Sequence, residues 1–187
     1  MADRSFFGGI GVALSHPQYR LYFISNLVST IGRWIYRSSA AWFTWKLTGS
    51  YEWLGIIAFA DIFPMVVLSM FAGALSDRIG YMRGIRTTQL FALILAFLLA
   101  VLILGDWIDI WILLGITIAH GCNEAISTPP RVSIVNALVP KKDLSAAIGL
   151  NSAQFNASRV VGPAIGGSLL LFLNAGWVFA IAAVTFA

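Results

Sequence analysis

The sequence predicts an all-α bundle of membrane-spanning helices. The chain has 187 residues, of which 59% are hydrophobic and only 11% are charged, and its mean hydropathy is +0.84. An ordinary soluble domain carries about 25% charged residues. The apolar runs are nearly continuous and lack the apolar/polar alternation of an outer-membrane barrel, so helices are expected throughout.

Each expected helix is an apolar run bounded by glycine, proline or charge, and a run of about 20 residues can cross the hydrocarbon layer. The first run ends at "TGS", the second at "SDRIG", the fourth at "PKKD" and the fifth at "NAG". Within one transmembrane domain over 1–187, the expected helices cover about 19–47, 53–76, 87–105, 109–139, 144–173 and 176–187. The last segment is too short to span. Because irregular ends are not left unsatisfied in lipid, a truncated sixth helix is favoured over a buried half-helix.

Basic residues alternate between successive connections. They lie before the first helix, between the second and third, and between the fourth and fifth: Arg4, Arg20, Arg78, Arg83, Arg86, Lys141 and Lys142. Connections with a majority of lysine and arginine stay in the cytoplasm. We therefore expect a multi-pass plasma-membrane protein, most simply of a bacterial inner membrane, with a cytoplasmic N-terminus. The net charge of +4 resides in these connections and does not indicate nucleic-acid binding.

Ionisable residues inside the expected spans distinguish this chain from a passive anchor. There are six of them: Arg33, Arg37, Asp61, Glu124, Arg131 and Arg159. Each charge facing lipid at a helix centre would cost about 2.5 to 3.5 kcal/mol. They must face one another or a water-filled cavity, and Arg33, Asp61, Glu124 and Arg159 are expected near mid-membrane.

Helical spacing gathers several of these charges onto common faces. Arg33 and Arg37 are four residues apart in the first helix, together with Asn26 and Thr30. Glu124 and Arg131 are seven apart in the fourth helix, with Thr117 and Thr128 on the same face. One interpretation is a set of structural ion pairs. The other is a substrate and coupling cavity, in which Glu124 or Asp61 exchanges a proton or meets a cation, and an arginine meets an anion.

The fifth expected helix is rich in small residues and contains a proline. The residues are Gly149, Ser158, Gly162, Pro163, Gly166 and Gly167. Proline removes a backbone donor and small residues allow close approach, so a hinge is one interpretation and simple helix packing is the other. Pro129 and Pro130 similarly interrupt the fourth helix.

No enzyme chemistry is predicted. Cys122 is a lone cysteine and is interpreted as a packing residue. His16 and His120 have no metal-ligand spacing; a proton relay is one interpretation of each, and a packing or interface residue is the favoured one. No phosphate-binding loop and no nucleophile with a nearby base is found. We expect no enzyme activity, no metal and no cofactor.

Two motifs resemble those of the major facilitator superfamily. Gly73, Asp77, Arg78, Gly80 and Arg83 resemble its loop signature G-x-x-x-D-R-x-G-x-[RK]-[RK], with Met82 as a departure. The small residues of the fifth helix are similar to its exporter-associated motif G-x8-G-x3-G-P-x2-G-G, in which Ser158 replaces one glycine. A third motif, R-x-x-Q-G, departs, because Thr117 and His120 stand at its first two defined positions. The amino-acid sequence of the first two helices resembles that of the bacterial branch that includes enterobactin exporters and macrolide efflux proteins.

This resemblance implies the N-terminal six-helix half of a twelve-helix transporter, built as 3+3 inverted repeats, with the C-terminal half missing from this chain. The implied function is a secondary active exporter of amphipathic small organic molecules, siderophore- or drug-like, working by alternating access in a lipid bilayer with a coupling proton. Gly73, Asp77, Arg78, Gly80 and Arg83 would form a cytoplasmic gate. An importer of the same fold and a non-transporting scaffold or half-transporter are the alternatives.

Overall fold

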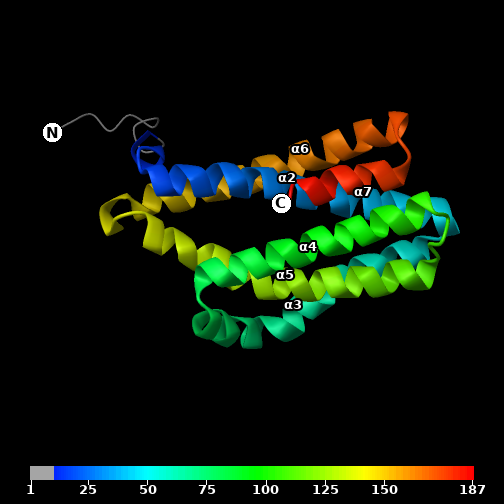
Figure 1. The fold of residues 1–187 in the computed structure, drawn as a ribbon, viewed down its shortest axis with the longest axis horizontal. Coiled ribbons are helices and arrows are strands. Elements are labelled where there is room, and N and C mark those ends of the chain that lie inside the picture. Colours follow the sequence, from blue (N-terminus) through cyan, green and yellow to red (C-terminus); the bar gives the residue numbers. More distant parts are fainter. Residues whose placement is uncertain (1–10) are drawn as a thin grey trace.

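The computed structural model describes residues 11–187, apart from the side chain of Asp77. All regular structure in this part is helical, which confirms the predicted all-α class. The elements are α2 (Pro17–Thr48), α3 (Tyr51–Ile79), α4 (Tyr81–Leu104), α5 (Ile110–Leu138), the short 3-10 helix η1 (Lys141–Asp143), α6 (Leu144–Phe172) and α7 (Ala175–Val184). Figure 1 shows the long helices lying side by side along the long axis of the molecule.

Helix length and composition together indicate membrane spans. Helices α2 to α6 have 24 to 32 residues, and at about 1.5 Å per residue each exceeds a hydrocarbon layer of about 30 Å. Among the described residues, three stretches are both long and apolar enough to cross: Tyr51–Ser76, Tyr81–Leu104 and Ile110–Leu138. Helices α2 and α6 are long enough to cross but are not among these three stretches. Both contribute polar side chains, among them Asn26 and Asn151, to the cavity described below.

Glycine and polar caps set the helix boundaries. Ser50 accepts hydrogen bonds from the backbone of Glu52 and Trp53, and Asp109 Oδ1 accepts one from Ile112 N at 2.7 Å. Between α3 and α4 there is one residue, Gly80, whose φ of 84° is readily adopted only by glycine. Because the chain reverses at this single residue, α4 begins at Tyr81 rather than near 87, where the sequence predicted it.

The connections divide between the two ends of the bundle. In Figure 1 the start of α2, the α3–α4 turn and the α5–α6 connection lie at one end, and the other three connections lie at the opposite end. The first set carries Arg20, Arg78, Arg83, Arg86, Lys141 and Lys142. At the opposite end, Trp53 and Trp111 pack edge to face with ring centroids 5.2 Å apart. The basic connections, which alternate with the others along the chain, are thus gathered at one end of the bundle.

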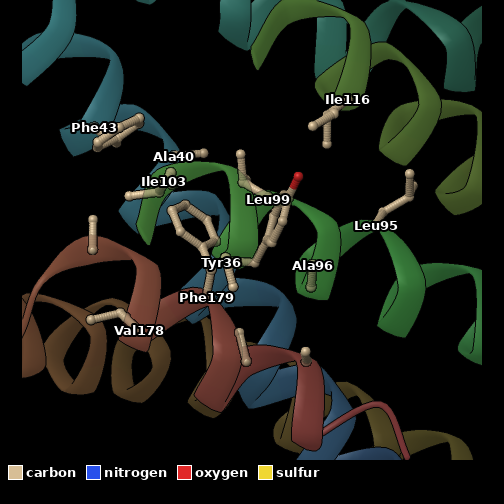
Figure 2. Close-up of a cluster of buried hydrophobic side chains, with 14 of the residues drawn as sticks. Tyr36, Ala40, Phe43, Leu95, Ala96, Leu99, Ile103, Ile116, Val178 and Phe179 are labelled. Carbon is tan, nitrogen blue, oxygen red and sulfur yellow. The ribbon is translucent and has the colours of Figure 1, made fainter. Parts of the chain in front are cut away.

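The apolar core lies where α7 packs against α4 and α2. Tyr36, Leu99 and Phe179 are at most 2% exposed, and the rings of Tyr36 and Phe179 meet edge to face at 5.3 Å. Figure 2 shows these side chains gathered between α2, α4 and α7. The other principal pairings are α3 with α5, α2 with α6, α4 with α5 and α2 with α7. One face of each of α2, α5 and α6 is not covered by these pairings and borders a cavity.

Candidate substrate site

A cavity of about 580 Å³ lies between α2, α5 and α6. Each of these helices contributes both polar and apolar side chains to its lining. The lining residues used below are Asn26, Thr30, Arg33, Trp34, Arg37, Glu124, Thr128, Arg131, Asn151 and Phe155. The polar face of the first helix, identified from the spacing of Asn26, Thr30, Arg33 and Arg37, therefore lines one cavity.

Glu124 is shared by two arginines. Its carboxylate lies 3.3 Å from Arg131 Nη2 and 3.9 Å from Arg33 Nε, and the glutamate is 8% exposed. Arg33 Nη2 also donates to Thr30 Oγ1 at 2.6 Å. The other terminal nitrogen, Nη1, has no hydrogen-bond partner among the described residues. One carboxylate thus faces two guanidinium groups, and one of those groups keeps a buried donor for another acceptor.

A second ion pair joins three helices beside the cavity. Asp61 on α3 lies 2.7 Å from Arg37 Nε on α2 and 3.1 Å from His120 Nδ1 on α5. His120 is fully buried, and its ring stacks on Tyr36 with centroids 4.3 Å apart. The sequence interpretation of His120 as a packing residue missed its contact with Asp61. Its spacing of four residues from Glu124, on one face of α5, was the available signal.

Trp34 forms an aromatic wall of the cavity. The guanidinium carbons of Arg37 and Arg159 lie 5.6 Å and 5.8 Å from the centre of its ring, and Phe155 packs edge to face at 5.9 Å. Cation–π contacts of this kind contribute about 0.5–1 kcal/mol each at exposed sites. Arg159 is exposed and is not among the cavity-lining residues. It therefore stands apart from the other five charged residues of the predicted cavity set, which the structure brings together.

The charges around the cavity do not cancel. Arg33, Arg37 and Arg131 provide three positive charges, and Glu124 and Asp61 provide two negative charges, which leaves one positive charge if His120 is neutral. Planar guanidinium groups match carboxylates and phosphates. Aromatic and polar walls beside a positive centre suit an amphipathic molecule that carries an acid group.

The small residues of the predicted hinge fall on two faces of α6. A side chain at Gly162 would overlap Trp34 Cβ, and one at Gly166 would lie 2.9 Å from Ser38 Oγ. Gly149 and Gly167, in contrast, border open space. Ser158 is buried, and α6 remains helical through Pro163. Gly162 and Gly166 therefore let α6 approach α2 closely, while the hinge role of the motif stays a prediction.

The residues of the predicted gate lie at the α3–α4 turn and not among the cavity-lining residues. Gly73 is within α3, Gly80 forms the turn, and Arg78 and Arg83 are exposed. The side chain of Asp77 lies outside the described part of the chain. Their role as a gate stays a prediction.

Metal-ligating residues do not cluster in the part of the chain that is described. No group of three His, Cys, Asp or Glu side chains there is placed to hold a metal ion. The carboxylates of the cavity region instead face arginine and histidine side chains.

Comparison with known proteins identifies the family. Residues 11–187 match the family described as transmembrane secretion effectors. The chain is 28% identical over 168 residues to the staphyloferrin A transporter of Staphylococcus aureus, which covers 89% of this chain and 42% of the relative. It is 23% identical over 171 residues to the uncharacterized MFS-type transporter YfiS of Bacillus subtilis, covering 87% of this chain and 40% of that protein. No solved structure matched.

The chain thus spans about two fifths of the length of these relatives. The family match extends over all of the described helices. The chain therefore belongs to the transmembrane secretion effector family of the major facilitator superfamily, a family of membrane transporters and not of enzymes.

Proposed function

We propose that this chain is the N-terminal half of a secondary active transporter that exports amphipathic small organic molecules by alternating access. The observation that carries the proposal is the net positive cavity between α2, α5 and α6, with Arg33 and Glu124 buried in its wall. A structural bundle gains little from such charges, because buried ion pairs are weak stabilisers. A transporter uses them to bind a ligand at depth.

The pattern of helix contacts supports two inverted three-helix repeats. Exchanging α2 with α5, α3 with α6 and α4 with α7 turns the α2–α6 contact into α5–α3, and the α4–α5 contact into α7–α2. The α4–α7 contact maps onto itself. Each of these pairs is in contact in the structure, as expected when a repeat is related to its partner by a two-fold axis in the membrane plane.

The share of the relatives that this chain covers supports a second helical half. At about 40% of each relative, the matched region is close to one half of a transporter. In the proposed assembly the second half closes the cavity and completes the substrate site. Arg78 and Arg83, with Gly73, Asp77 and Gly80, would form the cytoplasmic gate against it.

The distribution of basic residues supports a cytoplasmic N-terminus. The start of α2, the α3–α4 turn and the α5–α6 connection lie together at one end of the bundle, and lysine and arginine concentrate there. Positive connections are retained in the cytoplasm during insertion. The exporter is proposed to lie in the plasma membrane.

The proposed substrate is siderophore- or drug-like and carries at least one acid group. The cavity volume of about 580 Å³ lies within the usual range for small-molecule sites, about 300–1,000 Å³. The excess of arginine favours an acid group, and Trp34 with Phe155 offers apolar contact. One relative is named as a transporter of staphyloferrin A, which supports a small organic substrate.

Dye export from cells tests the proposal. Cells that overproduce the full-length protein are loaded with carboxyfluorescein, an anionic dye, or with ethidium, a cationic dye of comparable size, and the retained fluorescence is followed. We expect faster loss of carboxyfluorescein and unchanged loss of ethidium. Arg131→Gln should abolish the difference, whereas Arg20→Gln, an exposed arginine outside the cavity lining, should preserve it.

The alternatives give different results in the same assay. Slower loss of carboxyfluorescein, with greater accumulation, would identify an importer. Retention of both dyes equal to that of cells without the protein would favour a scaffold and contradict the proposal.

A further inference from the structure

We propose that Asp61 and His120 together form the binding site for the coupling proton, and that Arg37 transmits the occupancy of this site to the substrate cavity. This inference rests on the proposed function. It takes the ion that drives export to be a proton and assigns that proton a binding site. The pair lies at the junction of α3 and α5, and Arg37 extends to it from α2.

The geometry places one carboxylate between two basic groups. The two oxygens of Asp61 are divided between Arg37 Nε, at 2.7 Å, and His120 Nδ1, at 3.1 Å. Arg37 also lines the cavity, and its side chain is 31% exposed. Asp61 is therefore within one residue of the cavity, yet its own side chain is only 15% exposed.

The backbone brings α3 and α5 unusually close at this point. A Cβ on Gly121, the residue after His120, would lie 2.6 Å from the carbonyl oxygen of Asp61. Only the missing side chain of this glycine permits the approach. The His120–Asp61 contact is thus fixed by helix packing as well as by charge.

Buried polar atoms in the site remain available. His120 Nε2 and Tyr36 Oη are both buried and have no hydrogen-bond partner among the described residues. A buried polar atom without a partner is costly and calls for an explanation such as an unseen water or a transient proton. The stacked Tyr36 and His120 rings therefore present two unused polar atoms within one cluster.

The charged surroundings of the pair come from two helices. Tyr36 and Arg37 face it from α2, and Glu124 lies one turn along α5 from His120. Helices α4 and α7 pack apolar side chains against Tyr36 and contribute no ionisable group to this cluster. Arg37, which pairs with Asp61, and Glu124, one turn from His120, are therefore the charged groups nearest to the added proton.

Glu124 is a poorer site for the proton. It is the common partner of Arg33 and Arg131, so its neutralisation would leave two guanidinium groups without their counter-ion. Leaving buried charges uncompensated is strongly unfavourable. Asp61, in contrast, has a histidine partner, and an imidazole that accepts the proton remains paired with the carboxylate.

Binding of one proton weakens the Arg37–Asp61 ion pair that joins α2 to α3. The proton can reside on His120 Nε2 or be shared with the Asp61 carboxylate. In either case the pair gains one positive charge, and the only covalent bond that forms is the one to the added hydrogen. Attraction between Asp61 and Arg37 then weakens, which frees Arg37 on α2 from α3. The empty carrier is held by the Arg37–Asp61 pair, and the proton releases it.

Infrared difference spectroscopy tests the site without a substrate. Spectra of the purified full-length protein in lipid are recorded as the pH is changed. We expect a titrating imidazole or carboxylic acid signal that is lost in both Asp61→Asn and His120→Gln. The matched control is His16→Gln, because His16 pairs with Asp143 at the same 3.1 Å but away from the cavity. Signals that persist in both Asp61→Asn and His120→Gln would overturn the proposal.

A transport measurement separates this inference from the proposed function. Proteoliposomes loaded with carboxyfluorescein are given a pH gradient, and folding of each variant is checked by its thermal unfolding. Loss of the gradient dependence in Asp61→Asn and His120→Gln, with retained folding, supports the inference. Full gradient dependence in both variants would overturn it while leaving export intact. Absence of any transport in the parent protein, with a titrating Asp61–His120 pair, would instead overturn the proposed function.

Discussion

The apolar core and the substrate cavity both use α2, but the core packs it against α4 and α7 whereas the cavity lies between α2, α5 and α6. Tyr36 and Arg37 are neighbours on α2, yet Tyr36 packs into the core against Phe179 whereas Arg37 lines the cavity. Leu99 and Phe179 pack around Tyr36 in the core, whereas the cavity is lined by three arginines and a glutamate. The chain thus separates the contacts that hold its helices together from the charges that it keeps at depth.

The contrast between the core and the cavity reflects what stabilises a helix bundle in lipid. Lipid tails are as apolar as leucine, so helices associate through close packing and not through escape from water. The core meets this requirement with fully buried Leu99 and Phe179. The cavity instead holds ionised groups whose net contribution to stability is small or unfavourable. Substitutions in the two regions should therefore affect different quantities.

Truncation of the core should have the largest effect on stability. Leu99→Ala removes a fully buried side chain, and a leucine-to-alanine change in a packed core lowers the free energy of unfolding by about 2–5 kcal/mol. Leu98 is the matched control, because it is adjacent on α4 but 43% exposed. Thermal and denaturant unfolding in one detergent would measure both. Equal effects of Leu99→Ala and Leu98→Ala would refute the assignment of the core.

A change at the α2–α6 contact should have an intermediate effect and alter both regions. Gly162→Ala forces a methyl group against Trp34, and overpacking of this kind costs about 1–3 kcal/mol. Because Trp34 lines the cavity, carboxyfluorescein export should fall as well. Gly167→Ala, which points into open space, should leave both stability and export near those of the parent. Loss of export in Gly167→Ala without loss of stability would favour the hinge interpretation of the motif.

Removal of a buried hydroxyl should have the smallest effect. Ser158 is 1% exposed, and its Oγ has no hydrogen-bond partner among the described residues. Ser158→Ala removes a desolvated polar group, so we expect a change in unfolding free energy between zero and about 1 kcal/mol in the stabilising direction. Export should be unaffected. A clear destabilisation would show that Ser158 makes a bond in the working protein.

The fold class could be predicted because the membrane leaves few options. Every spanning segment must satisfy its own backbone hydrogen bonds, so long apolar runs bounded by glycine and charge indicate helices directly. The start of α4 was misplaced because the residues after Gly80 are basic and suggested a loop. A single glycine with positive φ is sufficient for the reversal, and Arg83 and Arg86 begin a helix.

The cavity could be predicted only in part. The four-residue spacing of Arg33 and Arg37 places them on one face, which required no knowledge of other helices. Partners on different helices depend on tertiary packing, so the joining of Asp61 to both Arg37 and His120 was not foreseen. Arg159 was expected to line the same cavity, but it lies on an exposed side of α6 and is not among the lining residues.

We propose that the space between α2, α5 and α6 is open to water and net positive. Thiol labelling tests it directly in the full-length protein, in a background without native cysteines that includes Cys122→Ser. Asn26→Cys on the cavity wall is compared with Tyr51→Cys at the exposed start of α3, using anionic sulfonatoethyl and cationic trimethylammonioethyl methanethiosulfonates. We predict that Asn26→Cys reacts, and that its ratio of anionic to cationic rate exceeds the ratio at Tyr51→Cys. No reaction at Asn26→Cys, or a lower ratio there, would contradict the account.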